Sequence, residues 1–324
     1  MKSICLIIPY FGKWPAWFNM YLETCRHNPS VDWLFFTDCE IPKDAAQNTK
    51  FFKMSLDDFS VLASKKLGLK IKLKTAYAYG RRPKVSEYRP ACGVIFEDYL
   101  KDYDFWGYSD IDVVYGDIRK FITDDMLETY DIITAKKKYI VGHFVIYKNC
   151  DKMNRLYQMA RGYKRVFLYT NKWYNFGECS KDFSRKRAKR PRGEEILNFI
   201  MCRINRVCEL LGTKVHFRNA EREVESMTDC VERLEKDGYL RSYFEDIAEE
   251  YGSKFKTGPV WKFCWNKGKL TEVYAGTEII YFHFFALKHK EQFILPNWQK
   301  IPEKFFITKD GFFAEQESPE IIKK

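Results

Sequence analysis

The stretch of residues 104–118, DFWGYSDIDVVYGDI, places two aspartates, Asp110 and Asp112, inside an otherwise apolar sequence. Alternate residues of a strand face the same side, so we expect both carboxylates to point together from the carboxyl end of a buried strand. Open α/β sheets bind their ligands at that edge. A bare D-x-D pattern also occurs as two solvated turn aspartates, but a carboxylate within an apolar run needs a partner. The context therefore favours a binding site.

Two carboxylates in this arrangement predict a divalent metal ion. Carboxylate oxygens are hard ligands, which suit Mg²⁺ or Mn²⁺ better than zinc. Ions of this kind commonly also bind the phosphates of a substrate. We therefore expect Asp110 and Asp112 to hold Mn²⁺ or Mg²⁺ beside a phosphorylated ligand.

The elements predicted around this stretch follow the order of an α/β sheet with mainly parallel strands. Strands are expected at residues 3–8, 32–38, 131–134, 142–149 and 278–285, with a hairpin within 260–274. Helices are expected from Pro15 to Asn28, at 56–67 with Ser55 as the N-cap, at 87–100, at 151–161, at 193–211 and in part of 221–250. The fold class predicted from these patterns is α/β.

Composition restricts the cellular context. No apolar run approaches the roughly 18 residues that span a membrane, and the first strand lacks the cleavage site of a signal peptide. The cysteines are scattered without a C-x-x-C pair, which favours reduced thiols over disulfides or a zinc site. The sequence thus predicts a cytoplasmic protein.

The formal net charge is +11, and much of the excess lies in residues 181–192. Such a charge attracts anions, among them nucleic acid, phosphorylated small molecules and anionic lipid headgroups. A basic nucleic-acid-binding protein is one hypothesis, but the cluster is local and no recognised nucleic-acid-binding motif accompanies it. We expect no nucleic-acid partner, and we expect this segment either to contact anionic membrane or to be a solvated loop.

His283 lies inside the apolar sequence YFHFF, where an imidazole needs a partner. A core histidine bonded to a backbone carbonyl is the competing interpretation. Lys288 follows five residues later, with His289 and Lys290 beside it. A metal ligand with neighbouring cations suits a diphosphate leaving group, because both stabilise the charge on the departing phosphate.

Four segments, PYFGKWPAWF, DWLFFTD, YRPACGVIFEDYLKDYDFWGYSDIDVVYGDIRKFI and GHFVIYKN, resemble a family of bacterial glycosyltransferases of the GT-A type. Members of that family are often associated with capsule, lipopolysaccharide or exopolysaccharide synthesis. The resemblance covers residues 4–150 and resumes at 278–290. It implies a Rossmann-like, mixed and mainly parallel sheet flanked by helices. It also implies a single GT-A-like domain, 1–324, made of a nucleotide-sugar-binding half at 1–150, an α-rich acceptor-side half at 151–290 and a C-terminal extension at 291–324.

Carried over position by position, the resemblance assigns most of the donor site. Asp110, Asp112 and His283 would bind Mn²⁺ or Mg²⁺, and Lys288 would bind the diphosphate. The donor would also contact Pro9, Tyr10, Phe11, Asp38, Arg89 and Asp110. Alternatives stay open for three of these residues: Asp38 is also suited to capping a turn, Tyr10 to the core, and Arg89 to pairing with Glu87 or Glu97.

The reaction and its partners are likewise implied by the resemblance. His143 would lie near the sugar or the acceptor and joins Asp112 as a catalytic candidate, for acceptor contact or proton transfer; an ordinary strand histidine is the alternative. An inverting enzyme needs a base within reach of the attacking hydroxyl, a retaining one does not, and both stereochemistries stay open. The donor would be a nucleotide sugar, with UDP-sugars favoured, and the acceptor a glycan or lipid-linked glycan at the inner face of the cytoplasmic membrane. A non-catalytic scaffold with the same fold and a nucleotidyltransferase are the other hypotheses.

Overall fold

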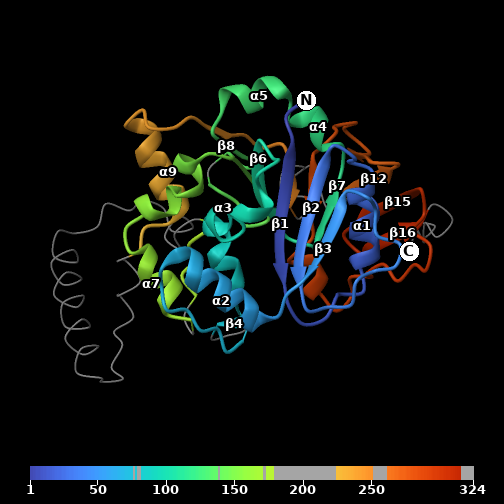
Figure 1. Cartoon of the computed structure of the whole chain (residues 1–324). Helices are drawn as coiled ribbons and strands as arrows, with labels where there is room; N and C mark the ends of the chain where they lie inside the picture. The colour runs from blue at the N-terminus through green and yellow to red at the C-terminus, as the bar shows by residue number, and fades with distance from the viewer. Residues whose placement is uncertain are drawn as a thin grey trace, which may run out of the picture. The chain divides into compact units, whose positions relative to one another are not determined.

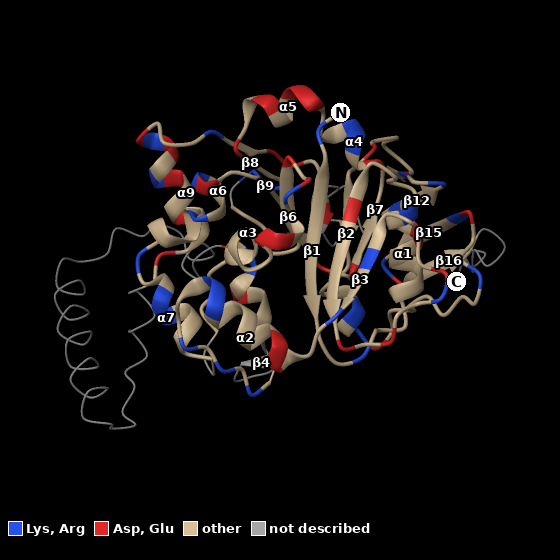
Figure 2. Ribbon diagram, in the orientation of Figure 1, with Lys and Arg blue, Asp and Glu red and all other residues tan. Residues whose placement is uncertain are grey.

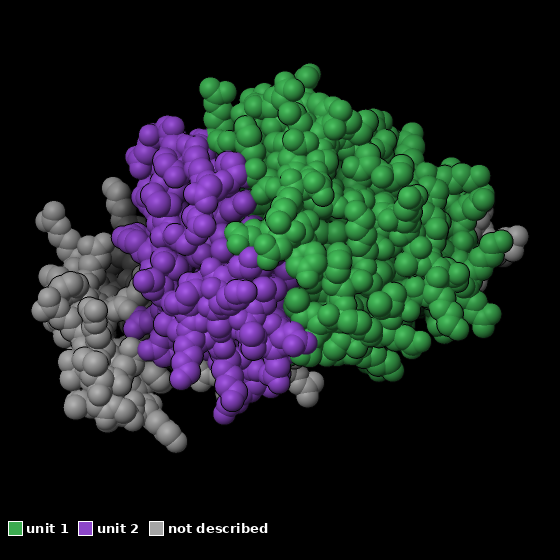
Figure 3. Space-filling view, viewed as in Figure 1, with its two compact units in different colours: residues 1–56, 97–149, 241–324 green, residues 57–96, 150–240 purple. Residues whose placement is uncertain are grey.

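The computed structural model of the protein describes residues 1–75, 77–78, 82–137, 139–170, 173–178, 224–250 and 261–314 (Figure 1). The helix expected at 193–211 and the basic segment at 181–192 lie outside these residues. The chain divides into two compact units, each of which gathers separate stretches of sequence (Figure 3). Unit 1 comprises Met1–Leu56, Glu97–Asn149 and Arg241–Lys324, and unit 2 comprises Asp57–Phe96 and Cys150–Leu240. The nucleotide-sugar-binding and acceptor-side halves are divisions by function and stay a prediction.

A seven-stranded sheet forms the centre of unit 1, in the order β10-β8-β9-β6-β1-β2-β3 (Figure 1). Its strands are β1 (Ile4–Tyr10), β2 (Val31–Thr37), β3 (Thr49–Lys53), β6 (Phe105–Ser109), β8 (Ile132–Thr134), β9 (Phe144–Lys148) and β10 (Ser242–Phe244). Strand β1 runs parallel to β2 and β6, β2 to β3, and β8 to β10, whereas β9 is antiparallel to β6 and β8. Strands β1 and β2 are almost continuously apolar because a parallel sheet buries both faces of its strands. The predicted α/β class with a mixed, mostly parallel sheet is confirmed, and the sheet is compatible with a Rossmann-like fold.

Helix α1 (Phe18–Arg26) contacts β3 and β7 through its apolar face. It begins three residues later than the sequence suggests, because the Phe18 N–H bonds to the Pro15 carbonyl, 3.0 Å away, and closes a turn there. The other described helices of unit 1 are short: η2 (Glu97–Tyr99), α4 (Ile118–Phe121), α5 (Asp124–Thr129) and η6 (Leu287–His289). Among the described helices of unit 1, α1 therefore provides most of the packing against β3 and β7.

Two smaller sheets complete unit 1. One has the order β11-β14-β7, with β11 (Glu249–Glu250), β14 (Tyr281–His283) and β7 (Val113–Tyr115). The other has the order β13-β12-β15-β16, with β12 (Lys262–Asn266), β13 (Lys269–Glu272), β15 (Lys304–Thr308) and β16 (Gly311–Ala314). The predicted hairpin is confirmed as β12–β13, whereas the β15–β16 hairpin in the C-terminal extension is not expected from the sequence. The strand expected at 278–285 is observed as β14, which lies in the three-stranded sheet and pairs antiparallel with β7 and parallel with β11.

The two faces of β14 bury different residues. Tyr281 packs in the core beside the large sheet, together with Tyr115 and Phe144. Phe282 and Phe284 point into a second core built largely from the four-stranded sheet. The alternation of a strand therefore turns His283 away from the second core and to the side of Tyr281.

Unit 2 is mainly helical. It contains α2 (Leu56–Leu67), β4 (Tyr77–Ala78), β5 (Arg82–Pro83), η1 (Lys84–Ala91), α3 (Cys92–Ile95), α6 (Asp151–Asn154), η3 (Leu156–Met159), α7 (Tyr163–Leu168) and α9 (Met227–Lys236). Helix α2 is confirmed with its predicted bounds. The single helices expected at 87–100 and 151–161 are wrong: each stretch is broken into shorter pieces. In the first stretch Pro90 lies within η1, and the pieces change after Ala91 and at Phe96.

Charged residues of both signs alternate along the helices and loops of the described chain, while the strands of the large sheet carry few of them (Figure 2). In the same residues, no helix combines the length and apolarity needed to cross a membrane. The basic segment at 181–192 is not among the described residues, so its predicted contact with anionic membrane stays a prediction.

The buried side chain of Asn28 ties the end of α1 to the end of β7. Its Nδ2 donates to the carbonyls of Gly116, at 2.9 Å, and Thr24, at 3.1 Å. Its Oδ1 accepts the N–H of Ile118, at 2.8 Å. Because β7 follows directly after the aspartate pair, this amide helps to set where that pair lies.

We expect Asn28→Ala to lower the free energy of unfolding by about 2–3 kcal/mol, since it leaves buried backbone groups without partners. The matched control is Asn19→Ala on the exposed face of α1, which should change it by no more than about 0.5 kcal/mol. Chemical denaturation followed by circular dichroism measures both values. Equal stability of the two variants would show that the Asn28 amide does not hold these elements together.

Candidate metal centre

Asp110 and Asp112 lie in the connection between two strands. Strand β6 is buried and ends at Ser109, and β7 begins at Val113, so both aspartates follow the carboxyl end of a buried strand, as expected, although neither is itself a strand residue. The chain bends between the large sheet and the three-stranded sheet at this point. The bend still brings the two carboxylates together, which is the outcome that the sequence predicts.

Hydrogen bonds from three separate elements fix this bend. The Asp110 N–H donates to the His143 carbonyl (3.3 Å), the Trp17 indole N–H to the Ile111 carbonyl (3.0 Å), and the Phe284 N–H to the Asp112 carbonyl (3.1 Å). The partners come from the start of β9, the start of α1 and the end of β14. Each residue of the bend is therefore anchored to a different part of unit 1.

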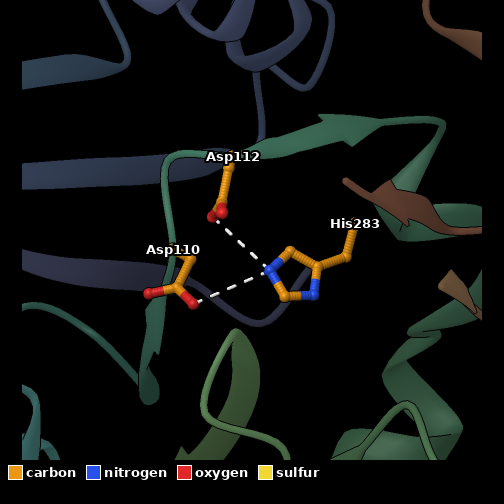
Figure 4. A group of neighbouring side chains, drawn as sticks. All are labelled: Asp110, Asp112 and His283. Carbon is orange, nitrogen blue, oxygen red and sulfur yellow. Dashed lines mark ion pairs between the residues drawn. The ribbon is translucent and has the colours of Figure 1, made fainter. Parts of the chain in front are cut away.

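His283 faces both carboxylates from the end of β14 (Figure 4). Its Nε2 lies 3.4 Å from Asp112 Oδ1 and 3.9 Å from Asp110 Oδ2. One ligand atom from each of the three residues lies within 4.8 Å of the other two. Ligands held at about 2.1 Å in an octahedron are about 3 Å apart when adjacent and about 4 Å apart when opposite. Two carboxylates and an imidazole this close together could hold a metal ion, and Mn²⁺ or Mg²⁺ as that ion stays a prediction.

Lys288 reaches the same carboxylate from η6. Its Nζ lies 2.8 Å from Asp112 Oδ2, on the oxygen that does not face His283. The ammonium also lies over the rings of Trp17, 5.3 Å from the centroid, and Phe285, 5.0 Å from the centroid. The structure thus brings Lys288 to the three candidate ligands, as the sequence predicts.

The electrostatics of the centre are dominated by the burial of Asp112, whose exposed fraction is 3%. Burial by itself raises the pKa of this carboxyl, but the adjacent His283 and Lys288 outweigh that effect and hold the pKa well below its usual range. Asp110 is partly exposed. The centre therefore presents one buried and one partly exposed carboxylate.

His143 also lies at this centre. Its ring stacks on that of His283, with centroids 3.9 Å apart and planes at 23°. The exposed fraction of His143 is 5%. The sequence places His143 near the sugar or the acceptor, and the structure places it against a candidate metal ligand.

Of the predicted donor contacts, Pro9 and Tyr10 are the last two residues of β1, Phe11 follows them in the loop, and Asp38 follows β2. Asp38 Oδ1 accepts the N–H of Gly12, at 2.8 Å, in a turn where the φ of +114° at Gly12 favours glycine. The structure thus gives Asp38 the capping role that the sequence leaves as an alternative. Its contact with a donor stays a prediction.

The aromatic residues at the end of β1 and in the segment after it pack on one another. The Tyr10 ring stacks on Trp14 with centroids 4.9 Å apart, and Trp14 stacks on Phe18 of α1 with centroids 3.8 Å apart. Tyr10 and Trp14 are partly buried against the core beside the large sheet. Core packing, the alternative left open for Tyr10, is therefore observed, and donor contact by Tyr10 and Phe11 stays a prediction.

Arg89 lies in unit 2, on η1, and its donor contact also stays a prediction. Glu87, one of the partners considered for Arg89, forms a buried ion pair with Lys84 at 3.3 Å. The Glu87 carboxylate also accepts the N–H groups of Tyr174 and Phe176. Its role is therefore to hold together the core of unit 2.

Two residues at the centre were not identified from the sequence, Trp17 and Phe285. Trp17 looks like one more apolar residue of the α1 stripe, and its indole N–H bond to Ile111 follows only from the fold. Phe285 is detectable in principle, because it lies two residues after His283 and so on the same side of an extended chain. It is 44% exposed, which is unusual for a phenylalanine beside a buried histidine.

No curated protein matches this chain. A family of unknown function, DUF6625, matches residues 6–316, which include every residue of the candidate metal centre and nearly the whole sequence. On the extent of this match, the chain belongs to the DUF6625 family.

Proposed function

We propose that the protein is a metal-dependent glycosyltransferase of the GT-A type, which transfers a sugar from a nucleoside-diphosphate sugar to a glycan or lipid-linked glycan. The observation that carries the proposal is the convergence of Asp110, Asp112 and His283. Lys288 contacts the oxygen of Asp112 that does not face His283. The donor set is that of a hard divalent cation, and a cationic side chain adjoins it. This combination suits the departure of a diphosphate.

In this proposal, Asp110, Asp112 and His283 would hold Mn²⁺ or Mg²⁺. The ion, when bound, would act as a Lewis acid that neutralises the diphosphate of the donor. The low pKa of Asp112 keeps its carboxylate ionised and ready to act as a ligand. Asp110 is the more exposed of the two carboxylates.

Lys288 would bind the diphosphate oxygens directly. Its side chain is 18% exposed, and its ammonium contacts Asp112 Oδ2. A cation in that place can leave Asp112 for a phosphate oxygen once a metal ion replaces it as the partner of the carboxylate. Lys288 would thus balance the charge of Asp112 in the free protein and that of the leaving group in the complex.

The acceptor side of the proposal rests on the resemblance to glycosyltransferases of surface-polysaccharide synthesis. A cytoplasmic location, with peripheral contact at the inner face of the membrane through residues 181–192, belongs to this part of the proposal. The candidate site has no features that favour the nucleic-acid hypothesis. Nucleotidyl transfer and a scaffold without activity are outcomes that the first experiment separates.

Asp112→Asn and His283→Ala should each lower the release of nucleoside diphosphate from sugar nucleotides by at least about 100-fold, because each removes a metal ligand. The measurement is a coupled assay over a panel of UDP-, GDP- and other sugar nucleotides with Mn²⁺. Saturating Mn²⁺ should raise the melting temperature of the wild type and not that of the variants, since the ion would bind only the native wild-type site. Excess EDTA should abolish the turnover.

The matched control is Asp117→Asn. Asp117 caps α4 through an Oδ1 contact with the Lys120 N–H, a role that asparagine can also fill, so turnover should stay at the wild-type level. Full turnover in Asp112→Asn, or in EDTA, would refute the proposal. Release of pyrophosphate from nucleoside triphosphates would instead indicate nucleotidyl transfer, and Mn²⁺ binding without any turnover would indicate a scaffold.

Lys288→Met should raise the KM for the sugar nucleotide by about 10- to 100-fold, because it removes a charge-assisted contact with the diphosphate. Its affinity for Mn²⁺ alone should be retained. Lys290→Met, an exposed lysine two residues further on, is the control and should leave the KM unchanged. Steady-state kinetics and calorimetric Mn²⁺ titration give the two quantities. Identical KM values for the two variants would remove Lys288 from the donor site.

A further inference from the structure

His143 is placed where it cannot easily serve as a general base. Its exposed fraction is 5%, and its ring lies against His283. A general base must reach the hydroxyl whose proton it removes, directly or through one water molecule. The His143 ring is buried, and one of its faces is stacked on His283. Its described contacts suit a structural role at the centre.

The backbone of His143 fixes one of the candidate ligand residues. Its carbonyl accepts the Asp110 N–H at 3.3 Å, at the point where β9 meets the end of β6. The carbonyl therefore helps to set the direction in which the chain leaves the large sheet and in which Asp110 points.

The side chain of His143 fixes a second candidate ligand. Its ring stacks on His283 with centroids 3.9 Å apart, and the edge of Tyr281 meets it at 5.4 Å and 84°. Phe285 lies 6.0 Å from the His283 ring, with planes at 25°. The rings of His143, His283 and Phe285 thus form a run of near-parallel planes. A ring held in such a run cannot rotate freely about its Cβ–Cγ bond.

We propose that His143 is a positioning residue, which holds the imidazole of His283 and the backbone of Asp110 so that both ligands face one ion. The inference rests on the proposed metal centre. Its physical basis is that a histidine ligand binds well only when its ring plane is fixed, and neighbouring groups supply that constraint. The stacked ring does so by packing, so an aromatic ring of another kind can replace it.

The test is the affinity of the full chain for Mn²⁺ alone, measured by calorimetry or from the spectrum of free Mn²⁺. His143→Ala removes the stacked ring and should weaken binding by about 10- to 100-fold. His143→Phe keeps a planar ring and should stay within about 3-fold of the wild type. Both retain the backbone carbonyl on Asp110.

A control on the same strand separates positioning from general stability. Ile146→Val removes one buried methyl group of β9 and should lower the melting temperature in EDTA while leaving Mn²⁺ affinity unchanged. A general-base role for His143 predicts the opposite pattern, in which both His143 variants bind Mn²⁺ normally and both lose turnover. That result would overturn the inference.

The remaining outcomes are also decisive. Equally weak binding by His143→Ala and His143→Phe would show that a ring nitrogen, and not the stacked plane, is what matters, and would overturn the inference as stated. Wild-type affinity in the Ala and Phe variants would remove only the positioning role. Absence of Mn²⁺ binding by the wild type would remove the proposed function together with it.

Discussion

The burial of one carboxylate, that of Asp112, imposes the arrangement around it. A buried charge is stable only with paired partners, and His283 and Lys288 supply them from the far end of the sequence. Both partners sit on one short segment, β14 and η6, so this segment must be held against the bend that carries the aspartates. The packing of unit 1 holds this segment in that position.

Strand β14 is held from both faces. Phe282 and Phe284 anchor it in the second core, against the four-stranded sheet near the C-terminus. Its opposite face carries Tyr281 and His283 toward the large sheet. The four-stranded sheet therefore supports the candidate centre although none of its strands carries a candidate ligand. The C-terminal extension contributes β15 and β16 to this support.

Features that depend on residues close together in the sequence were predicted correctly, whereas features that depend on contacts between distant elements were largely missed. Strands β1 and β2 and helix α2 are specified by local apolar patterns and capping residues, which the sequence displays directly. The single helix expected at 87–100 is observed as the shorter pieces η1, α3 and η2, and the strands β15 and β16 were not predicted, although Asp310-Gly311 is a turn signal between them. At the site, the candidate ligand residues can be recognised from the sequence. The bend at Asp110 and Asp112 cannot, because it depends on hydrogen bonds to distant elements.

The sequence by itself determined the α/β class, the order of the early elements and the chemical nature of the candidate ligands, because each depends on residue type and local spacing. Only the tertiary structure decided that His283 meets Asp112, that Lys288 occupies the other oxygen, and that His143 stacks behind the imidazole. The physical reason is the antiparallel pairing of β14 with β7, which joins segments more than a hundred residues apart. No local pattern encodes that pairing, since it is selected by the packing of both cores at once.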